Sequence, residues 1–211
     1  MVVTRLIIVR HGETDWNVEG RYQGQLDSAL TSIGRGQAEA LAERFSREEF
    51  SALYSSDLGR ARETAERIAV RTGHRVQLDS RLRERGLGQM QGLIRPEFEA
   101  KMPEEYQRFR TGDWDWAPPE GESGRQSVER FQAGLTDLAQ KHAGNRIAIV
   151  THGGVLGGFL RIVLGVDPDH PRRFRRFNAS WNVFSLDAGR WFVDTWGDIS
   201  HLEQTRSLDD T

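Results

Sequence analysis

A cationic side chain, an imidazole and a glycine stand side by side at residues 10–12, directly after the apolar run at residues 6–9. Arg10 carries a planar fork of N–H donors that suits a phosphate group. His11 is the side chain most readily neutral, and therefore nucleophilic, near pH 7. Gly12 lets the backbone approach closely because it has no Cβ. A buried strand that ends in these three residues predicts an anion held beside a nucleophile.

Two further groups of polar residues follow short runs of the strand type. The run at residues 51–56 leads into a segment that contains Arg60, and the run at residues 146–150 leads into His152 and two glycines. In α/β sheets, functional loops gather at the carboxyl ends of the strands. We therefore expect Arg60 and His152 to lie near Arg10 and His11.

The elements that must position these residues alternate between strand and helix patterns along the chain. Apolar residues recur at helical spacing after Thr31, after Asp57, which we expect to be an N-cap, and after Gly154. Such alternation predicts an α/β domain of packed layers with a largely parallel sheet. The expected strands are residues 4–9, 51–56 and 146–150, followed by a hairpin of residues 180–186 and 190–196.

Composition narrows the class of protein. A chain of 211 residues holds one large domain or two small ones, and 37% hydrophobic residues are enough for a core. The net charge of −2 gives no sign of a nucleic-acid-binding surface, and there is no cysteine for disulfides or thiolate metal sites. The sequence has no apolar run of roughly 18 residues that would span a membrane. The start is too weakly apolar for a signal peptide, so we expect a cytoplasmic protein.

Five separated motifs occur in a fixed order along residues 5–160. They are Arg10-His11-Gly12-Glu13-Thr14 with Trp16-Asn17 and Gln23-Gly24, then Ser55-Ser56-Asp57-Leu58 with Arg60-Ala61 and Thr64, then Leu82-Arg83-Glu84, Gly121-Glu122-Ser123, and Thr151-His152-Gly153-Gly154. This series resembles the histidine phosphatase superfamily, the phosphoglycerate mutase-like enzymes. Residues after 175 resemble its broad-specificity bacterial phosphatase branch, through Asn178-Ala179-Ser180 and Trp196-Gly197-Asp198.

The resemblance implies roles for the residues that match the motifs. His11 would be the nucleophile that forms a phosphohistidine. Arg10, Arg60 and His152 would hold the phosphoryl oxygens, and Asn17 would add a hydrogen bond. Phosphoryl transfer passes through a charge-rich transition state, so positioning and electrostatic stabilisation supply most of the catalysis.

The resemblance also makes Glu84 the proton donor to the leaving group. A carboxylic acid can give that proton if its pKa is raised, and the resulting carboxylate can then activate the water that hydrolyses the phosphohistidine. Since Arg10, Arg60 and His152 supply positive charge, we expect neither a metal ion nor a cofactor.

For the architecture, the resemblance implies a three-layer αβα sandwich with a mostly parallel central sheet and a small helical cap. We expect residues 1–203 to form one domain, with the cap inserted at about residues 92–120. Residues 204–211 read as a polar C-terminal tail.

The candidate substrate pocket draws on several motifs and on the cap. The aromatic residues of the cap, which also include Tyr106 and Phe109, either shape the leaving-group side or fill a small core of their own. Glu122 and Ser123 either line the pocket or cap a helix. The candidate pocket residues are Gln23, Gly24, Glu122, Ser123, Gly153, Trp114 and Trp116.

The sequence favours a phosphatase of small phosphorylated metabolites over two alternatives. A phosphoglycerate mutase of this family has a tyrosine shortly after the acidic residue and an arginine pair in the cap; here Arg85-Gly86-Leu87-Gly88 follows Glu84, and Arg108 and Arg110 are not so arranged. A catalytically silent phospho-ligand binder does not need the nucleophile and acid that this chain carries. The motifs bind the phosphate group and do not identify the molecule to which it is attached. The hairpin at residues 180–196 offers an edge for a homodimer.

Overall fold

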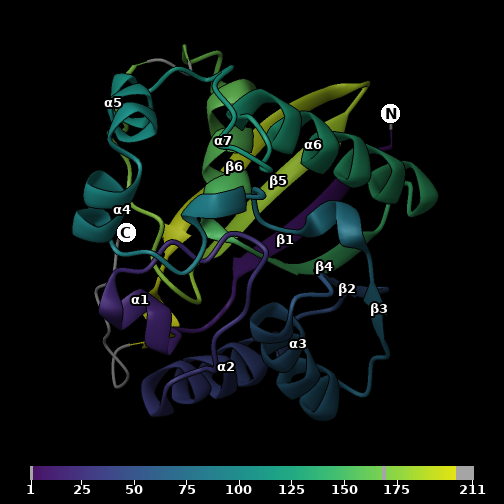
Figure 1. The fold of residues 1–211 in the computed structure, drawn as a ribbon. Helices are drawn as coiled ribbons and strands as arrows, with labels where there is room; N and C mark the ends of the chain where they lie inside the picture. The colour runs from purple at the N-terminus through teal and green to yellow at the C-terminus, as the bar shows by residue number, and fades with distance from the viewer. Residues whose placement is uncertain (1, 168–169, 203–211) are drawn as a thin grey trace.

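The computed structural model describes residues 2–167 and 170–202. At their centre lies a six-stranded sheet with the strand order β3-β2-β4-β1-β5-β6. Strands β1 to β4 pair with one another in parallel, whereas β5 pairs antiparallel with both β1 and β6 (Figure 1). The mostly parallel sheet and the C-terminal hairpin are confirmed. The strands are β1 (Thr4–Arg10), β2 (Leu53–Ser55), β3 (Val76–Leu78), β4 (Arg146–Thr151), β5 (Trp181–Asp187) and β6 (Arg190–Asp198).

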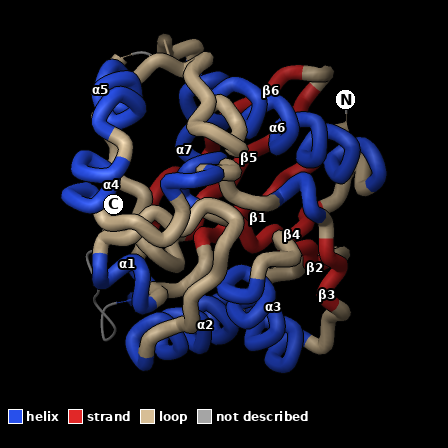
Figure 2. The backbone as a smooth tube through the Cα atoms, viewed as in Figure 1, coloured by secondary structure: helices blue, strands red, loops and turns tan. Residues whose placement is uncertain are grey.

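Helices cover both faces of the sheet, as Figure 2 shows. Alternate residues of a strand point to opposite faces, so Leu6 and Ile8 of β1 join one apolar cluster and Ile7 and Val9 join the other. The first cluster packs under α6 (Gly124–Lys141) and α7 (Gly153–Leu164), and the second under α2 (Ser32–Phe45) and α3 (Gly59–Thr72). This is the expected three-layer arrangement. It requires β1 to be apolar on both faces, which explains the unbroken run at residues 6–9.

The start of α3 differs from the expectation. Asp57 was expected to cap the helix, but the N-cap position is Leu58, whose side chain makes no cap hydrogen bond. Arg83 binds the carboxylate of Asp57 at 2.7 and 2.5 Å. The free N–H groups of the first turn donate instead to the carboxylate of Asp27, from Gly59 at 2.5 Å and from Arg60 at 3.3 Å. Asp27 is distant in sequence, so local spacing did not reveal this cap.

A close backbone contact joins α2 to the loop after β1. Thr31 caps α2 by accepting a hydrogen bond from the N–H of Gly34 at 2.9 Å. A Cβ added to Gly34 would stand 1.9 Å from the carbonyl oxygen of Glu13, which is backbone and cannot swing away. The loop that carries His11 therefore rests directly on α2 only because residue 34 is glycine.

Replacing Gly34 with Ala should lower the free energy of unfolding by about 1–3 kcal/mol, because the added methyl group overpacks this contact. Urea unfolding measures the effect. Ser32→Ala, at an exposed position of the same helix, is the control and should change stability by less than about 0.5 kcal/mol. Equal midpoints for Gly34→Ala and the unmodified chain would contradict the contact.

A smaller group of helices stands beside the sandwich, at the left of Figure 1. Residues 92–120, the expected cap, contain α4 (Arg95–Lys101) and α5 (Pro103–Thr111). Their buried side chains Phe98, Tyr106 and Trp116 form a separate cluster with Met90. Short elements complete the description: α1 (Asp15–Glu19), η1 (Ser80–Leu82), η2 (Gly88–Met90) and η3 (Ser200–Leu202). The predicted tail, residues 204–211, lies outside the described residues.

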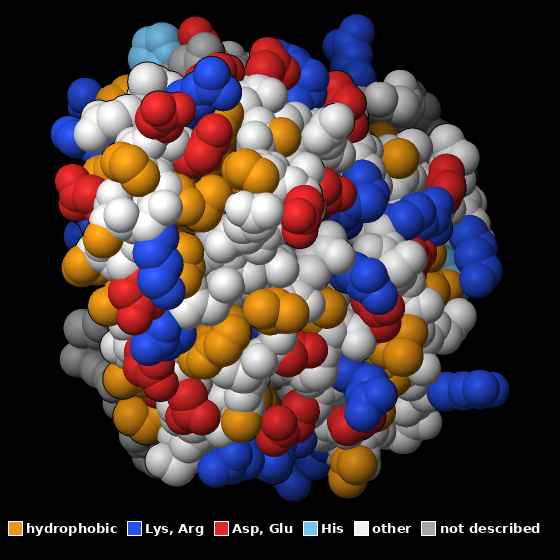
Figure 3. All heavy atoms as spheres, viewed as in Figure 1, with side chains coloured by type: hydrophobic (Ala, Val, Ile, Leu, Met, Phe, Trp, Pro, Cys, Tyr) orange, Lys and Arg blue, Asp and Glu red, His pale blue; other side chains and the backbone are white. Residues whose placement is uncertain are grey.

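Acidic and basic side chains are interspersed over the face drawn in Figure 3, with small apolar areas between them. Within residues 2–167 and 170–202, the helices lack the length and apolarity needed to cross a bilayer. Because charges of both signs are mixed on the face drawn in Figure 3, this face carries no large area of a single charge.

Candidate active site

Strand register brings the predicted residues together at one edge of the sheet. Arg10, the last residue of β1, pairs with Thr151 of β4, and Ser55 of β2 pairs with Val150 one step earlier. His11 and His152 therefore leave adjacent strands at the same level, and α3 brings Arg60 to them after β2. Arg10, His11 and Arg60 line a cavity of ≈ 360 Å³ together with Glu84 and Asn17. His152 is not part of the cavity wall, and its ring lies next to the ring of His11.

The side chain of His11 is 3% exposed, and hydrogen bonds define which nitrogen holds its proton. Nδ1 lies 2.7 Å from the carbonyl oxygen of Gly12, which can only accept, so Nδ1 carries the hydrogen. Nε2 then has a lone pair, and it accepts a hydrogen bond from Nε of Arg60 at 3.3 Å. Burial, followed by the positive charges of Arg60 and Arg10, holds the pKa of His11 well below 6.5. This is the protonation state that a nucleophilic imidazole needs.

His11 should consequently stay neutral when the pH falls through 6.5. A lowered pKa means that the proton is taken up only at a pH well below that of a free histidine, so the nucleophile is retained at mildly acidic pH. An NMR titration of ring-labelled protein from pH 8 to pH 5.5, with His11→Ala to assign the resonance, measures this. A His11 resonance that moves with a midpoint at 6.5 or above would contradict it.

Arg60 is bound on all sides of its guanidinium and is 2% exposed. Nη1 donates to the carbonyl of Leu26 at 2.7 Å and to the carboxylate of Asp27 at 2.8 Å, and Nη2 donates to the carbonyl of Gly24 at 2.7 Å. Burial lowers the pKa of Arg60, and the negative charge of Asp27 acts against that effect. These contacts place a rigid cation against Nε2 of His11.

Arg10 approaches the site from the end of β1 and is held by two features of the opposite wall. Its Nη1 donates to the carbonyl oxygen of Arg176. A Cβ on Gly153 would come within 3.1 Å of Nε of Arg10, so the glycine makes room for the guanidinium. The first turn of α7 is therefore shaped around the cation.

His152 is completely buried, and its two ring nitrogens differ in their hydrogen bonds. Nε2 lies 2.8 Å from the hydroxyl of Ser56, whereas Nδ1 is buried and has no hydrogen-bond partner among the described residues. Burial and the charge of Arg60 are the main causes that hold the pKa of His152 well below 6.5. The ring centroids of His152 and His11 are 5.2 Å apart. A buried polar atom without a partner is costly unless a ligand satisfies it.

The amide of Asn17 has its orientation set by its neighbours. Its oxygen accepts hydrogen bonds from the N–H of Thr14 at 3.1 Å, from the hydroxyl of Thr14 at 3.0 Å and from Nδ2 of Asn178 at 3.3 Å. The NH₂ group is left as the donor that this cavity-lining residue can offer a ligand.

Glu84 is held by three backbone N–H groups. Oε2 accepts from Gly154 at 2.7 Å, and Oε1 accepts from Val155 at 3.0 Å and from Arg85 at 2.8 Å. Gly154 and Val155 begin α7, where the helix dipole favours a carboxylate. A Cβ on Gly154 would lie 2.4 Å from Oε1, so a larger residue there would push the carboxylate out of this position. Oε2 accepts one hydrogen bond and keeps a lone pair for proton transfer.

The candidate pocket residues divide into two sets. Gln23, Gly24 and Gly153 line the cavity. Glu122, Ser123, Trp114 and Trp116 are not part of its wall: Ser123 caps α6, Trp116 is buried within the cluster of the cap, and Trp114 packs against the main core. Of the two readings for the cap aromatics, Trp116 and Tyr106 follow the core reading, whereas Phe109 also reaches the cavity.

Several wall residues were not predicted as members of the pocket. Arg176 belongs to the basic run of residues 172–176, whose sequence indicates either a solvated face or a surface that steers anionic substrates toward the pocket. Arg85 lies in a charge-rich stretch. Trp16 belongs to the first motif, but the resemblance assigned it no role. Tyr22 had no local signal, because only its packing with Phe109 reveals its place. The unpredicted residues are Trp16, Gly20, Arg21, Tyr22, Arg85, Leu87, Gly154 and Arg176.

Within residues 2–167 and 170–202, no group of three or more His, Asp and Glu side chains is placed to hold a metal ion. The positive charge at the cavity comes from arginines instead, and Arg10 and Arg60 flank the nucleophilic imidazole.

Comparison with known proteins agrees with this geometry. A sequence profile of the histidine phosphatase superfamily (branch 1) matches residues 6–199. In Arabidopsis thaliana, phosphoglycerate mutase-like protein 4 is 44% identical over 207 residues, which is 96% of this chain and 89% of that protein. Metal-independent phosphoserine phosphatase from the same plant is 43% identical over 210 residues, covering 98% of this chain and 86% of that protein.

A solved structure supports the same assignment. YhfR of Bacillus stearothermophilus superposes with a TM-score of 0.89 at 35% sequence identity, and the match covers 95% of this chain and 100% of that one. The matched profile spans all five motifs and the sheet that positions them. The chain therefore belongs to the histidine phosphatase superfamily and is a phosphatase, a hydrolase of phosphomonoesters.

Proposed function

We propose that the chain removes phosphate from small phosphorylated metabolites through a phosphohistidine on His11, without a metal ion. The observation that carries this proposal is the unprotonated Nε2 of His11, buried between two guanidinium groups. A phosphoryl group at this position meets a nucleophile and positive charge together. Phosphorus would replace the hydrogen bond from Nε of Arg60 at Nε2 of His11, and the freed N–H could then donate to a phosphoryl oxygen.

In the first step, the lone pair on Nε2 of His11 forms the P–N bond while the ester P–O bond breaks. Glu84 gives its proton to the departing oxygen, so an alcohol leaves rather than an alkoxide. In the second step, the carboxylate of Glu84 takes a proton from water as the water oxygen attacks phosphorus and the P–N bond breaks. Inorganic phosphate leaves, and both side chains return to their starting forms.

The phosphoryl oxygens would be held by Arg10, Arg60, Asn17 and His152. Support for the last of these is specific, because Nδ1 of His152 is buried without a partner among the described residues. The hydroxyl of Ser56 accepts a hydrogen bond from the N–H of Leu58 and can donate its own hydrogen to Nε2 of His152. The neutral ring would then carry its proton on Nδ1 and donate it to a phosphoryl oxygen.

The leaving-group side of the cavity favours a small substrate that carries a second negative charge. Arg85 lines this side, and its Nε and Nη2 donate to the backbone carbonyls of Glu122 and Trp116 at 2.7 and 2.8 Å. Both of these acceptors are backbone carbonyls, and the carboxylates of Glu84 and Glu122 also act on the charge of Arg85. Phosphoserine, the substrate in the name of one relative, has such a charge and is the first compound to assay.

A screen of phosphate release from phosphorylated metabolites in EDTA tests the proposal. We expect turnover that EDTA leaves unchanged; activity that appears only on addition of a divalent metal would contradict it. The same samples answer the second candidate, a mutase, which the name of another relative raises. Interconversion of 2- and 3-phosphoglycerate much faster than phosphate release would favour the mutase.

A further inference from the structure

Glu84 lies on a segment that has no regular structure of its own. It follows η1 and precedes η2, and residues 83–87 belong to neither a helix nor a strand. A general acid must be placed to within a fraction of an ångström for proton transfer. The position of this segment must therefore be set by side chains from elsewhere in the fold.

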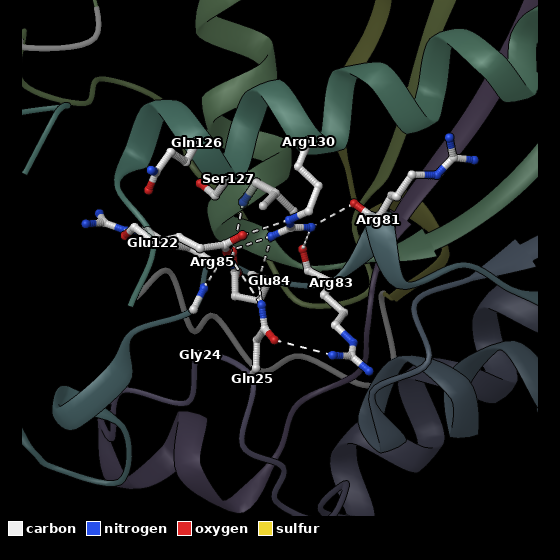
Figure 4. Close-up of polar contacts among 12 residues, drawn as sticks. Gly24, Gln25, Arg81, Arg83, Glu84, Arg85, Glu122, Gln126, Ser127 and Arg130 are labelled. Atoms are coloured by element: carbon white, nitrogen blue, oxygen red, sulfur yellow. Dashed lines mark hydrogen bonds and ion pairs between the residues drawn. The ribbon is translucent and has the colours of Figure 1, made fainter. Parts of the chain in front are cut away.

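Arg130 of α6 holds the backbone on the N-terminal side of Glu84, as Figure 4 shows. Its Nη1 donates to the carbonyl oxygens of Arg81 at 2.8 Å and of Arg83 at 3.0 Å. Its Nη2 donates to the carbonyl of Glu84 itself at 3.2 Å. One guanidinium thus binds three carbonyls within four residues of chain, and its remaining donors are still available to pair with a carboxylate.

Glu122 completes the attachment on the C-terminal side of Glu84. It pairs with Arg130, with Nε to Oε1 at 2.9 Å and Nη2 to Oε2 at 2.8 Å. Its Oε2 also accepts the N–H of Gly86 at 2.8 Å, and its backbone N–H donates to the carbonyl of Gly86 at 2.7 Å. The hydrogen bonds from Arg130 and Gly86 outweigh burial and keep the pKa of Glu122 below its usual value.

We propose that Arg130 and Glu122 are positioning residues that fix the segment of residues 81–86 and thereby align the carboxyl group of Glu84 with the leaving oxygen. The proposal rests on the proposed role of Glu84 as the proton donor. Neither side chain lines the cavity, so neither touches substrate. Their loss should displace the acid while His11 and the arginines around the phosphoryl group keep their contacts.

The dependence of activity on the leaving group separates this role from general stabilisation. An alkyl ester needs the proton of Glu84, whereas p-nitrophenyl phosphate releases a stable phenolate that hardly needs it. We expect Arg130→Met to lower kcat/KM about 10- to 100-fold for an alkyl phosphate and much less for the aryl ester. The ratio kcat/KM is the correct quantity because it reports the steps up to departure of the leaving group.

The chain offers a matched control in the ion pair of Arg44 and Asp198. Its side chains are 23% and 29% exposed, against 23% and 27% for Arg130 and Glu122, and it joins α2 to the end of β6, away from Glu84. Arg44→Met therefore removes an ion pair of matched exposure that does not bind the segment of Glu84. We expect it to change kcat/KM by the same factor for both esters.

Three outcomes are informative. Equal losses for both esters in Arg130→Met would overturn the positioning role. If Arg130→Met does not fold, Glu122→Gln takes its place, since it keeps the shape of the side chain but loses the charge. Glu122→Gln should lower kcat/KM more for the alkyl ester than for the aryl ester. Equal losses for the two esters in Glu122→Gln would also overturn the proposal. If Glu84→Gln lacks that dependence, the proposed function of Glu84 fails instead.

Discussion

A His11→Ala protein should fold normally and release phosphate at least about 10⁴-fold more slowly than the unmodified enzyme. Its imidazole is the group that forms the covalent bond to phosphorus in the proposed reaction. The arginines around it would still bind the phosphate group, so the substrate should be retained without turnover. The loss should therefore fall on kcat.

Direct labelling gives the decisive measurement. Substrate with radioactive phosphate, mixed with enzyme and quenched in alkaline denaturant to preserve the P–N bond, should leave label on the unmodified protein and none on His11→Ala. His142→Ala is the control, because His142 is bound to the hydroxyl of Tyr54, away from the cavity. Label that persists in His11→Ala, or an unchanged rate of phosphate release, would refute the nucleophile.

Replacing Glu84 with Gln should slow the hydrolysis of alkyl phosphates by about 10²–10⁴-fold, the usual contribution of a positioned general acid. Glutamine has the same shape, but its amide gives up no proton at these pH values. The penalty should shrink for an aryl phosphate, whose leaving group departs without help. Measurement of kcat/KM for both esters gives the comparison.

A control for Glu84→Gln must also remove a hydrogen-bonded carboxylate without touching the chemistry. Glu13 meets this need: it is 4% exposed, accepts a hydrogen bond from the hydroxyl of Thr31 at 2.7 Å and does not line the cavity. Glu13→Gln should destabilise the protein and lower kcat/KM by the same factor for both esters. A Glu84→Gln enzyme that hydrolyses alkyl phosphates at the unmodified rate would exclude Glu84 as the acid.

Local patterns predicted the elements that carry the site. Buried strands such as β1 and β4 announce themselves as β-branched runs, and polar residues at their ends mark where a parallel sheet exposes its loops. The gathering of His11, Arg60 and His152 follows from that topology. The roles of these residues stay predictions until they are tested.

Contacts between distant segments were beyond the reach of local patterns. Asp27, which caps α3 and pairs with Arg60, is 33 residues away from it in the chain. Arg176 stands in a basic run whose pattern predicted no contact with Arg10, but its carbonyl binds Arg10 and its side chain reaches the cavity. Trp116 was a candidate for the pocket wall, yet the cap uses it as core. In each case a three-dimensional neighbour decides the role.

The two glycines that begin α7 have a consequence for how such an enzyme diversifies. Gly153 backs onto Arg10 and Gly154 backs onto Glu84, so one dipeptide separates the cation from the carboxylate. This spacing belongs to the sandwich and owes nothing to α4 or α5. Substitutions within α4 and α5 should therefore leave the spacing between Arg10 and Glu84 unchanged. A change of substrate can then arise through α4 and α5 while the sandwich keeps Arg10 and Glu84 in place.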